Sequence, residues 1–211
     1  MIETLLEVSR LHRSPSHSRA MAVLAHLTRH PKNCHHLVFN FGSLVPVLQA
    51  ATDSPDKEAR RYAFCALQNL SVDKSCRAPI AHSPMVIWSL IQRCKKPTDD
   101  EDKADETRMA AMATLQNLSD EPANVIQFTI VQDCISTIIE IARGDSVQGE
   151  PTDLASFMAK NTLATLSHWF RKIATSGAER VRKAEIATGG TRAFVNLCNA
   201  TLAPKVYEQW S

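Results

Sequence analysis

The sequence lacks features that define several common protein classes. Only six of its 211 residues are glycine and two are tyrosine, which disfavours an all-β sandwich. A formal charge of +2 is too small to indicate a nucleic-acid-binding domain, which usually carries a clear basic excess. No apolar run is long enough to span a bilayer. The first residues, MIETLLEVSR, lack the basic-then-apolar layout of a signal peptide.

Catalytic motifs are missing as well. The sequence has no Gly-rich phosphate loop, nucleophile elbow or paired-carboxylate motif. Its histidines are scattered along the chain: His12, His17, His26, His30, His35, His36, His82 and His168. A lone helical histidine is more often structural than catalytic, although any fold can carry a grafted site. We therefore expect a non-enzymatic protein with no cofactor and no small-molecule substrate.

The cysteines indicate reduced thiols. They are Cys34, Cys65, Cys76, Cys94, Cys134 and Cys198, and none belongs to a CxxC pair. Disulfide frameworks are typical of shorter, secreted chains, so we expect core or half-buried thiols in a cytoplasmic or nuclear protein. Zinc is the alternative, with Cys34-His35-His36 as its best local cluster. Adjacent helical residues point about 100° apart, so these three cannot close on one ion without distant ligands, and we expect no metal site.

One leucine, followed by a hydroxyl residue, recurs at nearly constant spacing. It is Leu27 in LAHLT, Leu70 and Leu118 in LQNLS, and Leu166 in LATLS. The spacings are 43 residues from Leu27 to Leu70 and 48 residues for each of the next two steps. Such a period predicts a solenoid built from repeated structural units.

Each of these leucines ends a long helical stretch with apolar residues three and four positions apart, as in EARRYAFCALQNL. A second apolar stretch follows at 44–51, 85–94, 134–142 and 191–198. Shorter helical pieces lie upstream of it at 33–41, 124–132 and 182–190. The predicted unit is therefore a short helix, a sharp turn, a middle helix, a loop and a long helix.

That unit resembles the armadillo repeat. Residues 33–42, 124–133 and 182–190 match its first helix and turn, and 63–71 and 111–119 match its third helix with the Leu-x-Asn-Leu-Ser ending. The resemblance implies an all-α, right-handed superhelical solenoid of armadillo-like three-helix repeats, forming one domain over 1–211. The expected divisions are a partial unit at 1–32, full units at 33–75, 76–123 and 124–181, and a partial unit at 182–211.

Both ends of the chain depart from a capped solenoid. The chain opens in what resembles a middle helix, IETLLEVSRL, and stops soon after another. Solenoid ends normally carry polar caps. We expect either a piece of a longer protein or unusual packing at the ends.

Two units are longer than is usual for armadillo repeats, with insertions at 95–106 and 144–153. Proline and a run of acidic residues in the first favour a solvated loop, and the second lies in the equivalent place. The alternative is that the acidic part, 97–106, folds over the concave groove of the solenoid or docks a basic partner. Thr98, which precedes three acidic residues, also resembles the target of an acid-directed kinase.

A basic stretch at 171–183 stands beside Trp169 and Phe170. Basic and aromatic side chains together can hold a nucleic-acid strand by phosphate contact and base stacking. More often the aromatic residues belong to the core and the basic side chains face water. A nucleic-acid adaptor role is therefore the weaker alternative.

The repeated asparagines, Asn69 and Asn117, need a reason beyond the core. In armadillo proteins the matching asparagine lines the concave groove and binds the main chain of an extended peptide through its donor and acceptor. Residues four and seven positions earlier share that helix face. The implied groove residues are Arg19, Ala22 and His26; Tyr62, Cys65 and Asn69; Ala110, Ala113 and Asn117; and Met158, Asn161 and Thr165. The alternative is that the asparagines merely tie each long helix to the backbone of the next unit.

The resemblance implies a scaffold or adaptor that binds a peptide segment of a partner protein along the groove. The importin alpha family places tryptophan four residues before the asparagine, where Cys65 and Ala113 stand here, so recognition of a classical nuclear signal is not expected. An architectural module that packs against other domains, or self-associates through the solenoid ends, is the competing possibility.

Overall fold

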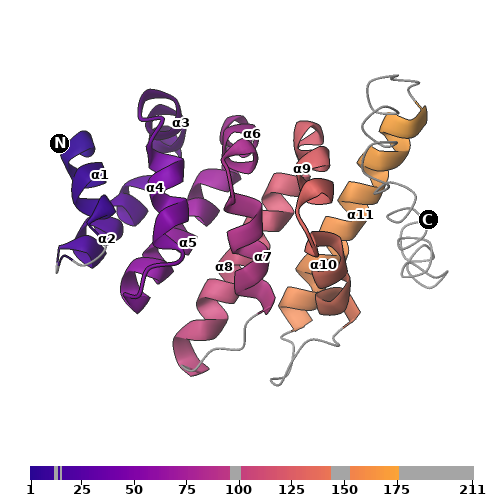
Figure 1. Cartoon of the computed structure of the whole chain (residues 1–211). Helices are drawn as coiled ribbons and strands as arrows, with labels where there is room; N and C mark the ends of the chain where they lie inside the picture. The colour runs from indigo at the N-terminus through magenta and orange to yellow at the C-terminus, as the bar shows by residue number, and fades with distance from the viewer. Residues whose placement is uncertain (12–13, 15, 96–100, 144–152, 176–211) are drawn as a thin grey trace.

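The computed structural model describes residues 1–11, 14, 16–95, 101–143 and 153–175, all of them helical or in turns and connections. The elements are α1 (Ile2–Arg10), α2 (His17–Thr28), α3 (Pro31–Asn40), α4 (Leu44–Ala51), α5 (Lys57–Val72), α6 (Lys74–His82), α7 (Val86–Lys95), α8 (Glu101–Ser119), η1 (Pro122–Asn124), α9 (Val125–Ile130), α10 (Cys134–Arg143) and α11 (Asp153–Thr175). Figure 1 shows them in a row that follows the chain from one end to the other.

The helices form three-helix units. A short helix, a middle helix and a long helix follow one another as α3–α4–α5, as α6–α7–α8, and as α9–α10–α11 with η1 before α9. The pair α1–α2 stands before them, and the short helices α3, α6 and α9 lie along one edge of the row (Figure 1). The fold is therefore an all-α solenoid of armadillo-like three-helix repeats, as the sequence predicted.

The long helices form the continuous layer of the solenoid. α2 packs against α5, α5 against α8, and α8 against α11. Each also packs against the middle helix of its own unit, and α1 takes that position beside α2. A side chain on a long helix therefore points into the core of its unit, against a neighbouring long helix, or out of the solenoid.

Alanines allow the long helices to approach one another closely. In α5, Ala59, Ala63 and Ala66 are completely buried, and Leu67 and Leu70 fill the space between the helices. Fully burying a leucine side chain stabilises the fold by about 1.5–3 kcal/mol relative to leaving it exposed to water. The helical period of the sequence therefore describes the core well.

Local signals explain where several helices begin. Asp56 accepts hydrogen bonds from the backbone N–H groups of Glu58 and Ala59 and so caps α5. The turns before α7 and α10 contain residues in the left-handed region, Met85 with φ 65° and Asp133 with φ 58°. Aspartate tolerates this conformation better than methionine does.

The structure locates one short helix and shortens one expected loop. The short helix of the second full unit, which was expected without a residue range, is α6, and it contains Pro79. The acidic stretch at 101–106 is not loop, since α8 begins at Glu101. Residues 96–100 and 144–152, the helical pieces at 182–190 and 191–198, the partial unit at 182–211 and most of the basic stretch at 171–183 lie outside the described residues.

Within the described part of the chain, no single helix has the length and apolar character needed to cross a membrane. The segments Pro122–Ile130 and Cys134–Arg143 together satisfy both criteria, but the chain bends by 97° between them.

Candidate functional site

The expected groove residues lie at three matching levels on the four long helices, and we call this set the long-helix face. It consists of Arg19, Ala22 and His26 on α2, Tyr62, Cys65 and Asn69 on α5, Ala110, Ala113 and Asn117 on α8, and Met158, Asn161 and Thr165 on α11. Because the long helices pack in sequence, the face crosses the solenoid from unit to unit.

The long-helix face is most exposed on α2 and most buried on α8. Arg19 and His26 on α2 are exposed, and most of the remaining members are half-buried. Ala110 and Ala113 are only 3% and 9% exposed, because a methyl side chain between packed helices hardly reaches the surface. Ala113 therefore forms the floor of the face and offers a ligand little contact area.

The amide of Asn117 connects two units. Its Nδ2 donates a hydrogen bond of 3.0 Å to Oγ of Ser71, which ends the Leu-x-Asn-Leu-Ser segment of the preceding unit. That hydroxyl in turn donates to the carbonyl oxygen of Gln68 at 2.7 Å. A serine hydroxyl has one donor and two acceptor lone pairs, so it serves its own helix and the next unit together.

Asn69 makes the equivalent connection one unit earlier. Its Nδ2 lies 3.3 Å from Oγ1 of Thr28 and 3.3 Å from the carbonyl oxygen of Ala25. Thr28, which is buried, donates to the same carbonyl at 2.8 Å. Leu-x-Asn-Leu-Ser thus repeats partly because the hydroxyl of one unit accepts from the asparagine of the following unit.

The expected groove role of the asparagines changes in one respect. The tie to a neighbouring unit exists, although it runs back to the preceding unit and mainly to a hydroxyl group. Among the described residues, neither Oδ1 of Asn69 nor Oδ1 of Asn117 has a hydrogen-bond partner. Each amide can therefore offer a ligand one acceptor in addition to the bond it already donates.

Arg61 links the α5 and α8 parts of this surface. Its guanidinium lies 3.0 Å from Glu58 and 3.5 Å from Glu106, and 4.5 Å above the ring centroid of Tyr62. Sequence reasoning missed this group. The three-residue spacing of Glu58 and Arg61 was a readable signal, but the contact with Glu106 depends on how α5 and α8 pack.

Cys65 has the least buried of the described cysteine thiols, and it lies at the centre of the α5 level. Burial raises its pKa, Glu106 adds to the rise, and Arg61 and Arg29 act in the opposite direction. The thiol therefore remains protonated at neutral pH. Its position between Tyr62 and Asn69 makes it a reporter for anything that covers the face.

The other described cysteines are free and buried. Cys34 donates to the carbonyl oxygen of Thr28 at 3.2 Å, whereas His35 and His36 are exposed and contact Phe39 and Phe41. The three side chains of the suggested zinc cluster thus diverge. Among the described residues, no group of three histidine, cysteine or acidic side chains is arranged to hold a metal ion.

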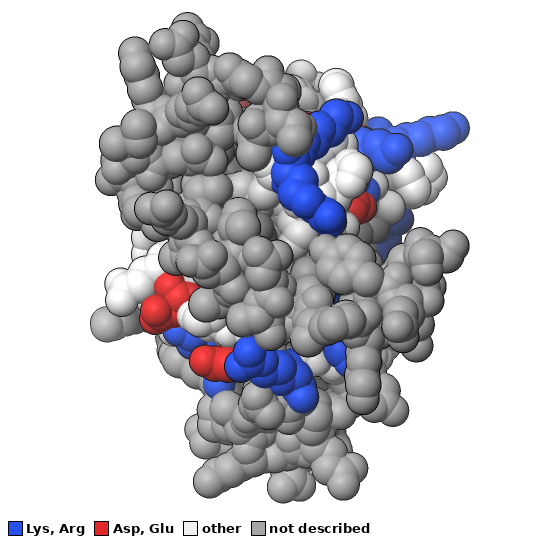
Figure 2. All heavy atoms as spheres, turned by 90° about the vertical axis from the view of Figure 1, so that its right-hand side faces the viewer, with Lys and Arg blue, Asp and Glu red and all other residues white. Residues whose placement is uncertain are grey.

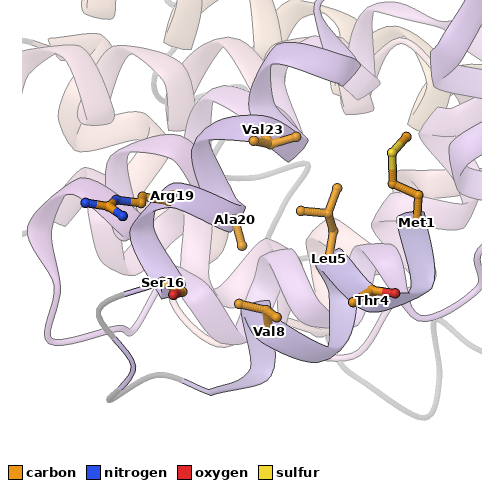
Figure 3. A pocket seen from close by; sticks show the side chains of 8 residues that line it. All are labelled: Met1, Thr4, Leu5, Val8, Ser16, Arg19, Ala20 and Val23. Carbon is orange, nitrogen blue, oxygen red and sulfur yellow. The ribbon is translucent and has the colours of Figure 1, made fainter.

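A hollow of about 450 Å³ opens between α1 and α2 at the N-terminal end of the solenoid. It is lined by Met1, Thr4, Leu5, Val8, Ser16, Arg19, Ala20 and Val23. Figure 3 shows apolar side chains from both helices around one space, with the guanidinium of Arg19 directed away from it. The positions of α5 that are equivalent to Ser16, Ala20 and Val23 are completely buried alanines that face the core. The hollow is therefore the surface of α2 that would pack against a preceding unit, and no described helix covers it.

At the other end of the solenoid, the described part of the basic stretch offers little for a nucleic acid. Phe170 is buried, and Nζ of Lys172 lies 5.1 Å from the ring centroid of Trp169. Figure 2 shows the visible basic side chains at this end in separate groups, with acidic side chains among them. Neither aromatic ring thus forms an open stacking platform.

Comparison with known proteins supplies no relative from which a function can be transferred. No protein-family profile matches the sequence, and no curated protein is significantly similar to it. A solved structure that it resembles is the designed armadillo repeat protein YIII(Dq)4CqI, with 12% sequence identity and a TM-score of 0.48 over 92% of this chain and 100% of that chain. At this level of similarity the fold assignment rests on the helices themselves.

Proposed function

We propose that this protein is a non-enzymatic scaffold that binds a peptide segment of a partner protein along the long-helix face. The observation that supports this most is that polar and apolar side chains lie at matching levels of four packed helices and are half-buried or exposed everywhere except at Ala110 and Ala113. An extended segment laid across the helices would meet one residue of each level in every unit. The site and localisation, cytoplasmic or nuclear, are part of this proposal.

The contacts available to such a peptide are uneven along the face. Tyr62 and Met158 supply apolar area, and the amide oxygens of Asn69 and Asn117 can accept from peptide N–H groups. Because each amide already donates to the preceding unit, it contributes one hydrogen bond to the ligand instead of two. Such a bond contributes about 0.5–1.5 kcal/mol, so affinity should depend more on the apolar contacts.

The proposal is tested by selecting 12-residue peptides from a random displayed library on the purified chain. Binding of the selected peptides is then measured with the variant Tyr62→Ala/Met158→Ala and with the matched control Phe39→Ala/Ile130→Ala. Phe39 and Ile130 are exposed apolar residues on the short helices α3 and α9 and do not belong to the long-helix face.

The variant Tyr62→Ala/Met158→Ala should bind the selected peptides at least tenfold more weakly, whereas the control should bind them as the parent chain does. Circular dichroism melts establish that both variants are folded. Equal binding by both variants would contradict the proposed site, and failure to select any peptide would contradict the proposed function.

The hollow between α1 and α2 favours a second candidate, self-association. Val23 is 43% exposed, whereas the equivalent Ala66 of α5 is completely buried. The occupant we infer is a second copy of this chain, because the hollow continues the packing interface that joins every unit to the one before it. Val23→Glu should then shift a dimer to monomer in analytical ultracentrifugation; a parent chain that sediments as a monomer at high concentration refutes this candidate.

A further inference from the structure

The stretch between Glu7 of α1 and Asp53 contains no acidic residue. From Val8 to Thr52 the sequence has neither aspartate nor glutamate, although it contains five of the arginines and lysines. They are Arg10, Arg13, Arg19, Arg29 and Lys32, and His12, His17, His26, His30, His35 and His36 accompany them. A formal charge of +2 for the whole chain hides this local excess.

The described side chains of the long helices include few carboxylates, although α8 begins with Glu101, Asp102 and Asp105, whose side chains are not described. Among the described side chains of α2, α5, α8 and α11, the only carboxylates are Glu58 and Glu106, and both pair with Arg61. Within the same described part of the chain, Arg19 and Arg29 form no ion pair with an acidic residue. Within the described residues, the positive charge at the α2 end of the long-helix face is therefore not neutralised by an ion pair.

Three of these basic groups lie together on one side of α2. Arg19 and His26 are seven residues apart, which is about two helical turns and 10 Å, and Arg29 continues the line beyond the end of the helix. All three are exposed. The guanidinium of Arg19 points out of the apolar hollow and toward solvent (Figure 3).

Arg29 also approaches the next unit. Together with Arg61 it lowers the pKa of Cys65 against the larger effect of burial, so both guanidinium groups lie close enough to act on the centre of the face. Of these two, Arg61 is already paired with carboxylates of the chain. Arg29 therefore brings a further positive charge to the α2–α5 junction.

We propose that the long-helix face selects peptide segments that carry carboxylates, and that Arg19, His26 and Arg29 bind them at the α2 end. This inference rests on the proposed function, since it specifies the class of peptide for the same site. Arginine is suited to this role because its planar guanidinium matches the two oxygens of a carboxylate. An acidic run of aspartate or glutamate would satisfy several of these groups at once.

The expected selectivity is moderate because the groups are exposed. An exposed ion pair typically changes affinity by about 1.5- to 5-fold, and salt screens it further. Reversal of one arginine to glutamate replaces attraction by repulsion, so we expect a loss of about tenfold at low salt.

The test uses three fluorescein-labelled 12-residue probes of one neutral peptide sequence, taken from the selection above, with four positions set to Glu, to Gln or to Lys. Fluorescence anisotropy compares the parent chain with Arg19→Glu and Arg29→Glu. The matched control is Lys32→Glu, which makes the same charge change on exposed α3. A single-stranded 12-nucleotide DNA serves as a fourth, anionic probe.

The Glu probe should bind at least fivefold more tightly than the Gln probe and lose about tenfold with either arginine variant, while the Lys32→Glu variant retains nearly all of its affinity. Equal binding of the Glu and Gln probes, an equal loss with Lys32→Glu, or tighter binding of the DNA would each overturn the inference. If the Gln probe binds as well as the Glu probe and is lost in Tyr62→Ala/Met158→Ala, the groove function survives without acidic selectivity. If no probe depends on that variant, the groove function itself fails.

Discussion

Removing the amide of Asn117 should weaken the junction between the long helices α5 and α8. The perturbation is Asn117→Ala, which deletes the 3.0 Å hydrogen bond to Ser71. Ser71 is completely buried, so its hydroxyl oxygen loses the N–H group from which it accepts, and water replaces this donor only poorly. Such a loss costs about 1–2 kcal/mol, offset by up to about 0.7 kcal/mol because alanine favours the helix more than asparagine does.

The net expectation for Asn117→Ala is therefore a loss of about 1 kcal/mol in the free energy of unfolding. A double-mutant cycle with Ser71→Ala isolates the bond, because the helix-propensity contributions of the single variants cancel. We expect a coupling energy of about 0.5–1.5 kcal/mol in urea unfolding followed by circular dichroism. The matched control is Gln116→Ala, a half-buried amide one residue earlier in α8.

Two results would refute this reasoning. One is a coupling energy of zero within error, which would mean that the two side chains do not interact in solution. The other is an equal effect of Asn117→Ala and Gln116→Ala, which would mean that position on the helix matters and the amide bond does not. Either result would return the asparagines to a role in ligand binding alone.

Three further predictions concern the core, the thiols and the acidic stretch. Leu70→Ala or Leu118→Ala should each cost about 2–5 kcal/mol in thermal or urea unfolding, because both leucines are completely buried and each change leaves a cavity; a cost below 1 kcal/mol would contradict the packing. Burial raises the pKa of Cys76 to about 11 and that of Cys94 to about 12, so the folded chain keeps protons that the unfolded chain loses above about pH 9. The free energy of unfolding should therefore be highest below that pH and fall as the pH rises toward 12. A free energy of unfolding that does not change over this range would contradict the burial of these thiols. Replacing residues 97–100, which precede α8, with a Gly-Ser linker should shift Tm little, because loop length costs entropy only logarithmically; a large drop would contradict this expectation.

The sequence predicted the described fold well because the repeat signals are local and redundant. The leucine period, the alanines of the long helices and the apolar middle stretches each predict the same helical unit. The middle helix α4 spans Leu44–Ala51, as expected. The residue range of the short helix α6 was not predicted; the side chain of Asp73 caps its start, and the helix continues through Pro79.

The candidate site was less predictable, because its details depend on contacts between units. The spacing of Asn69 and Asn117 placed them on matching levels, but the hydroxyl groups that accept from them lie more than 40 residues away in the chain. The contact between Arg61 and Glu106 spans two units in the same way. The absence of acidic residues from Val8 to Thr52 was readable from the sequence, but its meaning required the exposed positions of the arginines.

The claim that the long-helix face binds a peptide is tested most directly by the accessibility of Cys65 during ligand binding. Its thiol is half-buried at the centre of the face, whereas the other described cysteines are buried. The measurement is the rate of N-ethylmaleimide alkylation at this residue, followed by peptide mass spectrometry, with and without a selected 12-residue peptide at about ten times its Kd. The account predicts that Cys65 reacts about tenfold more slowly when the peptide is bound; an unchanged rate at saturating peptide would contradict it.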